Sequence, residues 1–199
     1  MLKIKLLPFA LSGLLLALSA QSADDNGQFA IDGAGAQQCK VYTNAWEQNS
    51  RDAYVFIGWL DGYVSGQNQT NNQTFDLTPW QTSETMASLV YKACKNTPDD
   101  SFLLATIKVL RFLAPTKQSA QTALIKVEVE GQSVYLYQQT IDAIHKKLNS
   151  LEYLANSDNK TFNTKSQSAL KKFQEQNGLP ATGFPDQKSL IMLLLGQVK

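Results

Sequence analysis

The stretch ALKKFQEQNGLPATG, residues 169–183, restricts the fold more than any other part of this sequence. Its apolar residues recur three and four positions apart up to Phe173, which is the spacing of a helix with one buried face. Gly178 stands where a helix C-terminus favours a residue with positive φ, and Pro180 prevents the helix from continuing. The stretch therefore predicts a helix that ends abruptly in a tight turn.

A last short helix is predicted after this turn. Gly183 allows a second change of direction, and Pro185 with Asp186 favours the start of a helix. The apolar face of that helix is formed by Leu190, Leu193 and Leu194.

The order of these residues resembles the peptidoglycan-binding-like domain, a small three-helix module attached to many bacterial hydrolases. In that family a helix V-x-x-L-Q-x-x-L-x-x-L-G-Y and a D-G-x-F-G loop precede A-x-x-x-F-Q-x-x-x-G-L-x-x-T-G. The matching positions here are Ile141, Ile144, Leu148, Leu151, Tyr153, Phe162, Ala169, Phe173, Gln174, Gly178, Leu179, Thr182, Gly183, Leu190 and Leu194. The resemblance covers about residues 137–195 and implies a peptidoglycan ligand.

Several positions depart from the family pattern. The departures are His145 for a Gln, Glu152 for a Gly, Asn159 and Lys160 for Asp-Gly, and Asn163 for the second loop Gly. Asn tolerates a left-handed backbone, so the change at Asn163 is expected to be mild. Lys160 at a Gly position implies that the loop is re-formed.

The resemblance supplies the class of ligand, and the residues themselves suggest where it binds, in a groove between the first helix and the loop from Tyr153 to Phe162. The candidate ligand-binding residues are Tyr153, Asn159, Lys160, Lys165 and Gln174. The aromatic ring would contact a sugar or peptide, the amides would donate and accept hydrogen bonds, and the lysines would attract stem-peptide carboxylates. The alternative is that Tyr153 and Phe162 belong to the core and that the lysines form a solvated face.

A secretory signal peptide is predicted at residues 1–23. Lys3 and Lys5 form a positive start, and an almost wholly apolar run ends before small residues that suit cleavage after Ser22. A retained membrane anchor is the alternative, but a spanning helix needs about 20 apolar residues. We therefore expect a periplasmic or secreted protein with no membrane partner after cleavage.

The charges divide the remaining chain in two. Residues 24–115 contain ten acidic residues and six Lys or Arg, whereas residues 116–199 contain seven acidic residues and ten Lys. Arg51 and Arg111 are the only arginines, so the sequence lacks the Arg-rich basic face of a nucleic-acid-binding protein. We expect no nucleic-acid partner.

The two cysteines, Cys39 and Cys94, both belong to the acidic half. In an exported protein a lone pair most simply forms a disulfide, and two free buried thiols are the alternative. A zinc site is disfavoured because the only histidine, His145, lies in the other half. We therefore predict a Cys39–Cys94 disulfide and no metal site.

Four helices are predicted in the acidic half. They begin near Cys39, near Asp52, at Thr78-Pro79 and at Asp99 or Asp100, and the last ends at Pro115. The apolar side of the second is formed by Val55, Phe56, Trp59 and Tyr63. Gly58, Gly62 and Gly66 recur every four residues, which strips one face of side chains and can let another backbone come close. A membrane dimer motif is the alternative for this spacing, but Asp61 and the short, polar-flanked segment argue against it.

The acidic half is similar to the HdeA-like superfamily of small periplasmic helical proteins. The resemblance depends on Cys39, GWLDGYVSG at 58–66, DLTP at 76–79, Cys94 and the corner at 96–98. It covers about residues 29–114 and implies a disulfide-tied helical fold. The group includes acid-stress chaperones and is close in style to immunity proteins that neutralise wall amidases.

A β-hairpin is predicted between the halves. Period-two alternation from Ala123 to Val129 indicates a half-buried strand, and Glu130-Gly131 is a usable turn before a second strand that ends at Tyr137. Thr116–Gln121 is expected to be a short polar linker. The predicted fold class is mainly α, and the predicted order is signal peptide 1–23, helical domain 24–115, linker and hairpin 116–137, and three-helix module 138–199.

Catalysis is not expected from this sequence, and neither is a cofactor. His145 occupies a helix-face position, no serine lies in an elbow context, and Asp99 with Asp100 suits helix capping better than acid-base chemistry. The first hypothesis is an exported wall-binding protein whose residues 24–115 meet an envelope partner. The second is a periplasmic acid-stress chaperone, or an inhibitor or immunity protein, in which the C-terminal module is only a scaffold.

Overall fold

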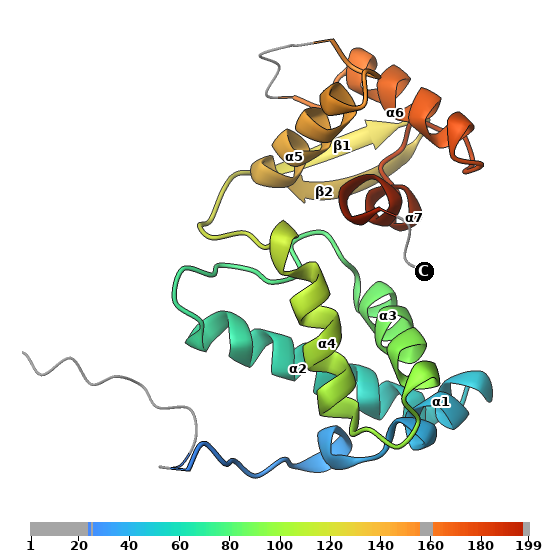
Figure 1. Cartoon of the computed structure of the whole chain (residues 1–199). Helices are drawn as coiled ribbons and strands as arrows, with labels where there is room; N and C mark the ends of the chain where they lie inside the picture. Colours follow the sequence, from blue (N-terminus) through green and yellow to red (C-terminus); the bar gives the residue numbers. More distant parts are fainter. Residues whose placement is uncertain (1–23, 25, 156–160, 197–199) are drawn as a thin grey trace, which may run out of the picture. The chain divides into compact units, whose positions relative to one another are not determined.

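A computed structural model describes residue 24, residues 26–155 and residues 161–196 (Figure 1). The helices and strands of the described residues all belong to one compact unit, which begins at Asp32. The predicted signal peptide and the site candidates Asn159 and Lys160 lie outside the described residues. No described helix combines the length and the apolar composition that crossing a bilayer requires.

The first half of this unit is a set of helices packed around an aromatic cluster. Its elements are η1 (Gly33–Ala36), α1 (Cys39–Glu47), α2 (Arg51–Thr70), α3 (Ser83–Asn96) and α4 (Phe102–Leu113). Tyr42, Phe56 and Phe102 meet with ring centroids 4.7 to 5.1 Å apart, an arrangement that stabilises a core beyond simple burial. The buried Tyr42 hydroxyl donates to the Ala87 carbonyl at 2.8 Å, and burial raises the pKa of this phenol.

The buried face of α2 differs from the prediction. Its buried residues are Ala53, Phe56, Leu60 and Val64, which are spaced by three and four positions. Val55 lies one position off this stripe and is 62% exposed, so its assignment to the apolar side is wrong. Trp59 and Tyr63 are partly buried and pack beside the stripe, as predicted.

The glycine face of α2 does not lie in close contact with another backbone. A Cβ atom added at Gly58, Gly62 or Gly66 would meet no atom within 4 Å, so the described residues do not make the close backbone approach that this face permits. Close approach occurs instead at Gly35 in η1, where a Cβ would overlap the Trp59 ring. The Trp59 indole N–H also donates to the Asp32 carbonyl at 2.9 Å, which fixes η1 against α2.

Two helices begin later than predicted because other side chains cap them. Helix α3 begins at Ser83, and its N-cap Thr82 accepts a hydrogen bond from the Thr85 amide, whereas the predicted start at Thr78 is a turn held by Asp76. Helix α4 begins at Phe102 and is capped by Ser101.

The carboxylates predicted to cap α4, those of Asp99 and Asp100, form ion pairs instead. Asp100 pairs with Lys108 at 2.6 Å, and Asp99 pairs with Lys40 at 3.4 Å. The hydrogen bond from Lys108 lowers the pKa of the Asp100 carboxyl. Both pairs are substantially exposed, so each contributes little to stability.

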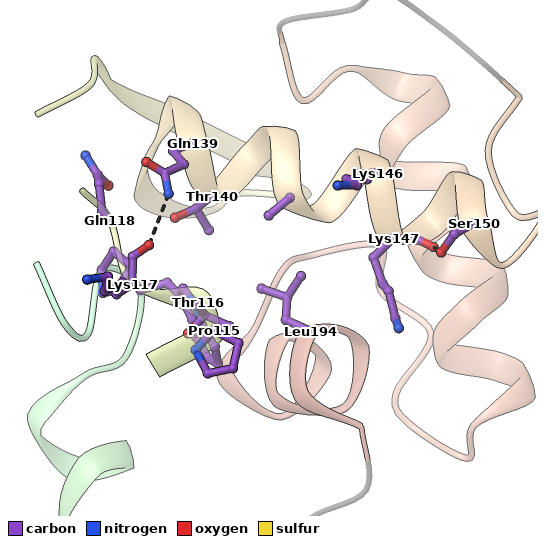
Figure 2. A pocket seen from close by; sticks show the side chains of 13 residues that line it. Pro115, Thr116, Lys117, Gln118, Gln139, Thr140, Lys146, Lys147, Ser150 and Leu194 are labelled. Carbon is purple, nitrogen blue, oxygen red and sulfur yellow. Dashed lines mark hydrogen bonds between the residues drawn. The ribbon is translucent and has the colours of Figure 1, made fainter. Parts of the chain in front are cut away.

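The segment predicted as a short polar linker is hydrogen-bonded to an earlier loop. The backbone amide of Gln118 donates to the Asp76 backbone carbonyl at 2.8 Å. The backbone carbonyl of Gln118 accepts from the backbone amides of Phe75 and Asp76, at 2.8 and 3.0 Å. The Gln118 side chain is fully buried, which differs from a solvated linker. Gln139 in turn donates to the Lys117 carbonyl at 3.1 Å, the bond drawn as a dashed line in Figure 2.

The predicted β-hairpin is confirmed. Strands β1 (Leu124–Val129) and β2 (Gln132–Tyr137) pair antiparallel, with Leu124 opposite Tyr137 and Val129 opposite Gln132. Glu130 and Gly131 both have positive φ, 50° and 81°, as a two-residue hairpin turn with primed geometry requires. Val127, Val129 and Leu136 point into the core.

The C-terminal helices pack with the hairpin around a second core. They are α5 (Gln138–Ser150), α6 (Thr164–Gln176) and α7 (Gln187–Leu190), followed by the π-helical turn η3 (Ile191–Leu195). Figure 1 shows α5 beside the hairpin, with which it makes contacts through β2. The fully buried members of this core are Leu136, Ile141, Ile144, Leu148, Leu170, Leu190 and Leu193. Trp80, from the loop before α3, belongs to the same cluster.

Helices α5 and α6 end in the same hydrogen-bonded motif. At the end of α6 the Leu179 amide donates to the backbone carbonyl of Gln174, and the Gly178 amide donates to that of Glu175. Gly178 has a φ of 67°, which confirms the predicted end of the helix. At the end of α5 the Tyr153 amide donates to the Leu148 carbonyl and the Glu152 amide to the Asn149 carbonyl. Glu152, which replaces the family glycine, keeps a φ of 64°.

Asn163 is tolerated for a reason other than the one predicted. Its φ is −100°, which is not left-handed, and its side-chain oxygen accepts hydrogen bonds from the Lys165 and Ser166 amides at 3.0 and 3.2 Å. Asn163 is therefore the N-cap of α6, a position that favours asparagine.

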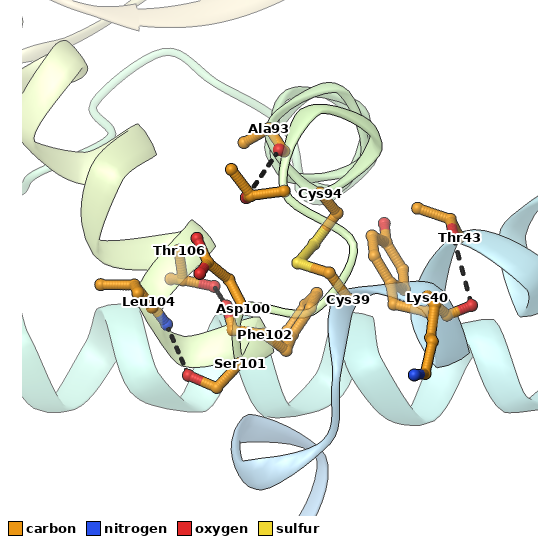
Figure 3. Close-up of a disulfide and its surroundings, with 12 residues drawn as sticks. Cys39, Lys40, Thr43, Ala93, Cys94, Asp100, Ser101, Phe102, Leu104 and Thr106 are labelled. Atoms are coloured by element: carbon orange, nitrogen blue, oxygen red, sulfur yellow. Dashed lines mark hydrogen bonds between the residues drawn. A yellow bond between two sulfur atoms is a disulfide. The ribbon is translucent and has the colours of Figure 1, made fainter.

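The predicted disulfide joins Cys39 to Cys94, with an S–S distance of 2.02 Å (Figure 3). It connects the first residue of α1 to the last turn of α3, and both cysteines are fully buried. The Cys39 amide also donates to the Asp100 carbonyl and the Phe102 amide to the Gln37 carbonyl, both at 2.8 Å. The cross-link thus lies where three segments meet.

We predict that Cys39→Ala with Cys94→Ala lowers the free energy of unfolding by about 4 kcal/mol. The cross-linked residues are separated by 55 positions, and losing the link restores the entropy of that loop to the unfolded chain. Urea unfolding followed by circular dichroism measures the difference. Wild-type protein unfolded in reductant is the control, and its free energy of unfolding should match that of the double variant. Equal free energies of unfolding for the oxidised wild type and the variant would contradict the prediction.

We also predict that Glu152→Gly raises the free energy of unfolding by about 1 kcal/mol. Glycine adopts the φ of 64° without the steric cost that a Cβ imposes there. Glu152→Ala keeps the Cβ and is the matched control, for which we expect no gain. Thermal unfolding of the three proteins tests this, and a lower melting temperature for Glu152→Gly than for Glu152→Ala would refute it.

Candidate functional site

A pocket of about 330 Å³ opens between the turn that follows α5 and the first half of α6. Its described lining residues are Tyr153, Leu154, Ala155, Thr164, Lys165, Ser168, Ala169 and Lys172. The prediction placed the groove between the first helix of the module, which is α5, and the loop from Tyr153 to Phe162. In the structure, the wall opposite the turn at Tyr153 is formed by α6 and not by α5. We call this surface the α6 pocket.

Tyr153 supplies the aromatic wall of the α6 pocket and is itself well positioned. Its ring lies edge-on to Phe173, with centroids 5.7 Å apart and planes at 89°. Its hydroxyl donates to the Gln176 side-chain oxygen at 2.6 Å. Because both the ring and the hydroxyl are held by α6, the half-buried ring offers a fixed surface for stacking.

The other wall of the α6 pocket is polar and positively charged. Thr164, Lys165, Ser168 and Lys172 are exposed and recur at the spacing that places residues on one face of a helix. In the described part of the chain neither lysine forms an ion pair, and none of the described lining residues is acidic. The pocket therefore presents two ammonium groups and two hydroxyl groups beside an aromatic ring.

The structure brings together two of the five predicted ligand-binding residues, Tyr153 and Lys165. The prediction missed Ser168 and Lys172, although their separation from Lys165 by three and seven residues was visible in the sequence. The sequence analysis gave a core position for Phe162 as the alternative, and Phe162 is buried.

Gln174 does not line the α6 pocket, because its side chain is fully buried and bonded within the protein. Its side-chain nitrogen donates to the Phe184 carbonyl and to the Ser189 hydroxyl, both at 2.9 Å. Its side-chain oxygen accepts from the Gly183 amide at 2.7 Å. Gln174 therefore holds the turn before α7 rather than presenting its amide to a ligand.

His145 is also internal. Its Nε2 lies 2.8 Å from the Ser166 hydroxyl, and its ring stacks on Phe162 with centroids 6.2 Å apart. His145 is 8% exposed and Ser166 only 1%. The pair joins α5 to α6 beneath the surface. No group of three or more metal-ligating side chains occurs in the described residues.

Residues 137–193 match the family model described as "Putative peptidoglycan binding domain". The matched segment includes α5, α6, α7 and all the described lining residues of the α6 pocket. Comparison with curated proteins and with solved structures gives no match to this chain. The family match supports peptidoglycan binding by this segment, whereas the HdeA-like resemblance of the first half stays a prediction.

We predict that Gly183→Ala destabilises the protein more than Gly178→Ala does, by about 2 kcal/mol. Both glycines have similar positive φ values, 71° and 67°, so the backbone strain of a Cβ is the same. Only the Cβ at position 183 would meet another group, the Gln167 carbonyl oxygen at 2.8 Å, and it would push apart the turn bonded to Gln174. Urea unfolding of both variants measures the difference, and equal losses would show that the turn adjusts freely.

Proposed function

We propose that this protein is an exported, non-catalytic protein of the bacterial cell envelope, periplasmic or secreted, that binds peptidoglycan through the α6 pocket. The single observation that carries the proposal is the family match over residues 137–193, which contains the described walls of that pocket. The signal-like sequence of residues 1–23 supports export, and so does the buried Cys39–Cys94 disulfide.

The chemistry of the α6 pocket suits a ligand that combines sugar rings with peptide carboxylates. Sugar rings and acyl groups pack on aromatic faces such as that of Tyr153, whose orientation is fixed by α6. Lys165 and Lys172 attract carboxylates, and Thr164 and Ser168 donate to or accept from hydroxyl and amide groups. Exposed charges contribute little individually, so we expect weak binding that decreases with salt.

The absence of catalysis belongs to the proposal and is supported by the burial of His145 and Ser166. A histidine and a serine in hydrogen-bond contact are the usual parts of an activated nucleophile. Here Ser166 is 1% exposed and the His145 ring is covered by Phe162, so a wall polymer has no access to the pair.

The test is co-sedimentation of the purified protein with peptidoglycan sacculi. We expect Lys165→Gln with Lys172→Gln to weaken binding about threefold to tenfold, since two charge contacts to the ligand are lost. Lys171→Gln with Lys188→Gln is the matched control, because it removes the same charge from exposed positions outside the pocket and should leave binding unchanged.

Two outcomes would overturn the proposal. Wild-type protein that stays in the supernatant at low salt would exclude wall binding. Equal losses in the two double variants would show that binding depends on net charge and not on the α6 pocket. Circular dichroism of each variant confirms that it is folded.

A further inference from the structure

The two lysines of the α6 pocket are anchored on one continuous helix, two turns apart. Lys165 lies in the first turn of α6, and Lys172 follows seven residues later, which is about 10 Å along the helix axis at 1.5 Å per residue. Because both belong to the same helix, the separation of their backbone positions is fixed. The pocket is therefore suited to a ligand that carries two negative charges and not one.

The surroundings of the two lysines differ. At the Lys165 end, the first turn of α6 adds the Thr164 hydroxyl and the positive end of the helix dipole. At the Lys172 end lies the ring of Tyr153, because this ring packs edge-on against Phe173, the next residue of α6. A ligand that spans the pocket places one negative group at the start of α6 and the other beside the aromatic ring.

The middle of the α6 pocket is narrow. Its lining there is formed by Ser168 and Ala169 of α6 and by Leu154 and Ala155 of the facing turn. The exposed Ser168 hydroxyl can donate to or accept from a peptide group. The volume of about 330 Å³ is at the small end of the range of ligand pockets, about 300–1,000 Å³. The pocket therefore suits a short peptide better than a glycan strand of several sugars.

An extended peptide with two carboxylates matches the spacing of the two lysines. Its residues advance about 3.3 Å each, so carboxylates that are three residues apart lie about 10 Å from each other. The stem peptides of a bacterial wall carry free carboxylates. A cross-link between two stem peptides removes one of them, because the carboxylate becomes the carbonyl of an amide bond.

We propose that the α6 pocket selects stem peptides with two free carboxylates about three residues apart, and so binds wall that is not cross-linked at that peptide. One carboxylate lies near Lys165 and the other near Lys172, and the peptide backbone between them passes Ser168. The glycan chain stays outside the pocket. This inference rests on the proposed function, because it names the part of peptidoglycan that the same site binds.

The first experiment titrates N-acetyl-Asp-Ala-Ala-Ala, whose two carboxylates are three residues apart, into the purified protein labelled with ¹⁵N. The backbone amide resonances of Tyr153 and Ser168 should shift. The C-terminal amide of this peptide, and N-acetyl-Asp-Ala, whose carboxylates are one residue apart, should each bind about threefold more weakly, since each loses one charge contact. Equal affinities for the three peptides would overturn the proposal.

A second experiment combines loss of a ligand carboxylate with loss of a lysine. We expect Lys165→Gln to cancel the effect of amidating one carboxylate and Lys172→Gln to cancel that of amidating the other, because a contact that is already lost cannot be lost again. Lys171→Gln is the matched control, since Lys171 is exposed on α6 outside the pocket, and both effects should persist in it. Amidation effects of the same size in all three variants would exclude contact between the lysines and the carboxylates.

Sacculi test the preference in the wall itself. An endopeptidase that hydrolyses the cross-links consumes one water per bond and leaves one carboxylate and one ammonium group, so the net charge of the wall does not change. The treated sacculi should retain about twofold to threefold more protein than an equal mass of untreated sacculi. Glycan chains from which an amidase has removed the stem peptides should not compete for the protein.

Equal retention by treated and untreated sacculi, or competition by the stripped glycan chains, would overturn this inference. The proposed function would survive either result, provided that sacculi still bind the wild-type protein and bind the Lys165→Gln with Lys172→Gln variant more weakly. Failure of the inference and failure of the proposed function are therefore separate outcomes.

Discussion

The hydrogen bonds of the Gln174 side-chain amide determine where the turn at Gly183 and helix α7 lie, and the second core depends on them. A buried amide left unpaired costs about 1–3 kcal/mol, so a fully buried glutamine restricts its surroundings strongly. The oxygen and nitrogen of Gln174 are both satisfied only when the chain turns at Gly183 and α7 follows at once. The two fully buried leucines that follow, Leu190 and Leu193, then complete the core.

The elements that the sequence predicted well are those specified by local patterns. The buried stripe ending at Phe173, the hairpin turn at Glu130-Gly131 and the pairing of the two cysteines each depend on neighbouring residues or on a unique pair. The start of α3 was misplaced because a cap at Thr82 competes with the equally plausible one at Thr78. The burial of Gln118 was not predicted, because its segment is held by backbone hydrogen bonds to Phe75 and Asp76, which are distant in the sequence. No periodicity reveals which polar groups pair over such separations.

The candidate site was predictable in part for the same reason. Tyr153 and Lys165 were chosen for their chemistry and both line the α6 pocket. Lys172 was within reach of helical spacing, because it lies on α6 two turns beyond Lys165. Gln174 was misplaced since an amide in a sequence gives no sign of whether its donors face solvent or a neighbouring turn. The pocket of about 320 Å³ between α5, Pro79-Trp80 and residues 115–118 could not be predicted at all. Its walls come from segments that are separated by up to 115 positions between Pro79 and Leu194.

The Cys39–Cys94 disulfide also sets how far the two ends of the chain can be drawn apart. A tensile load applied across the cross-link passes through the two sulfur atoms, so the intervening residues 40–93 carry none of it. Fully extended, those residues would add about 190 Å of contour length, at about 3.5 Å per residue. Reduction of the disulfide would make this contour length available. The oxidised form therefore has a shorter maximum end-to-end distance, even when its helices have been unfolded by force.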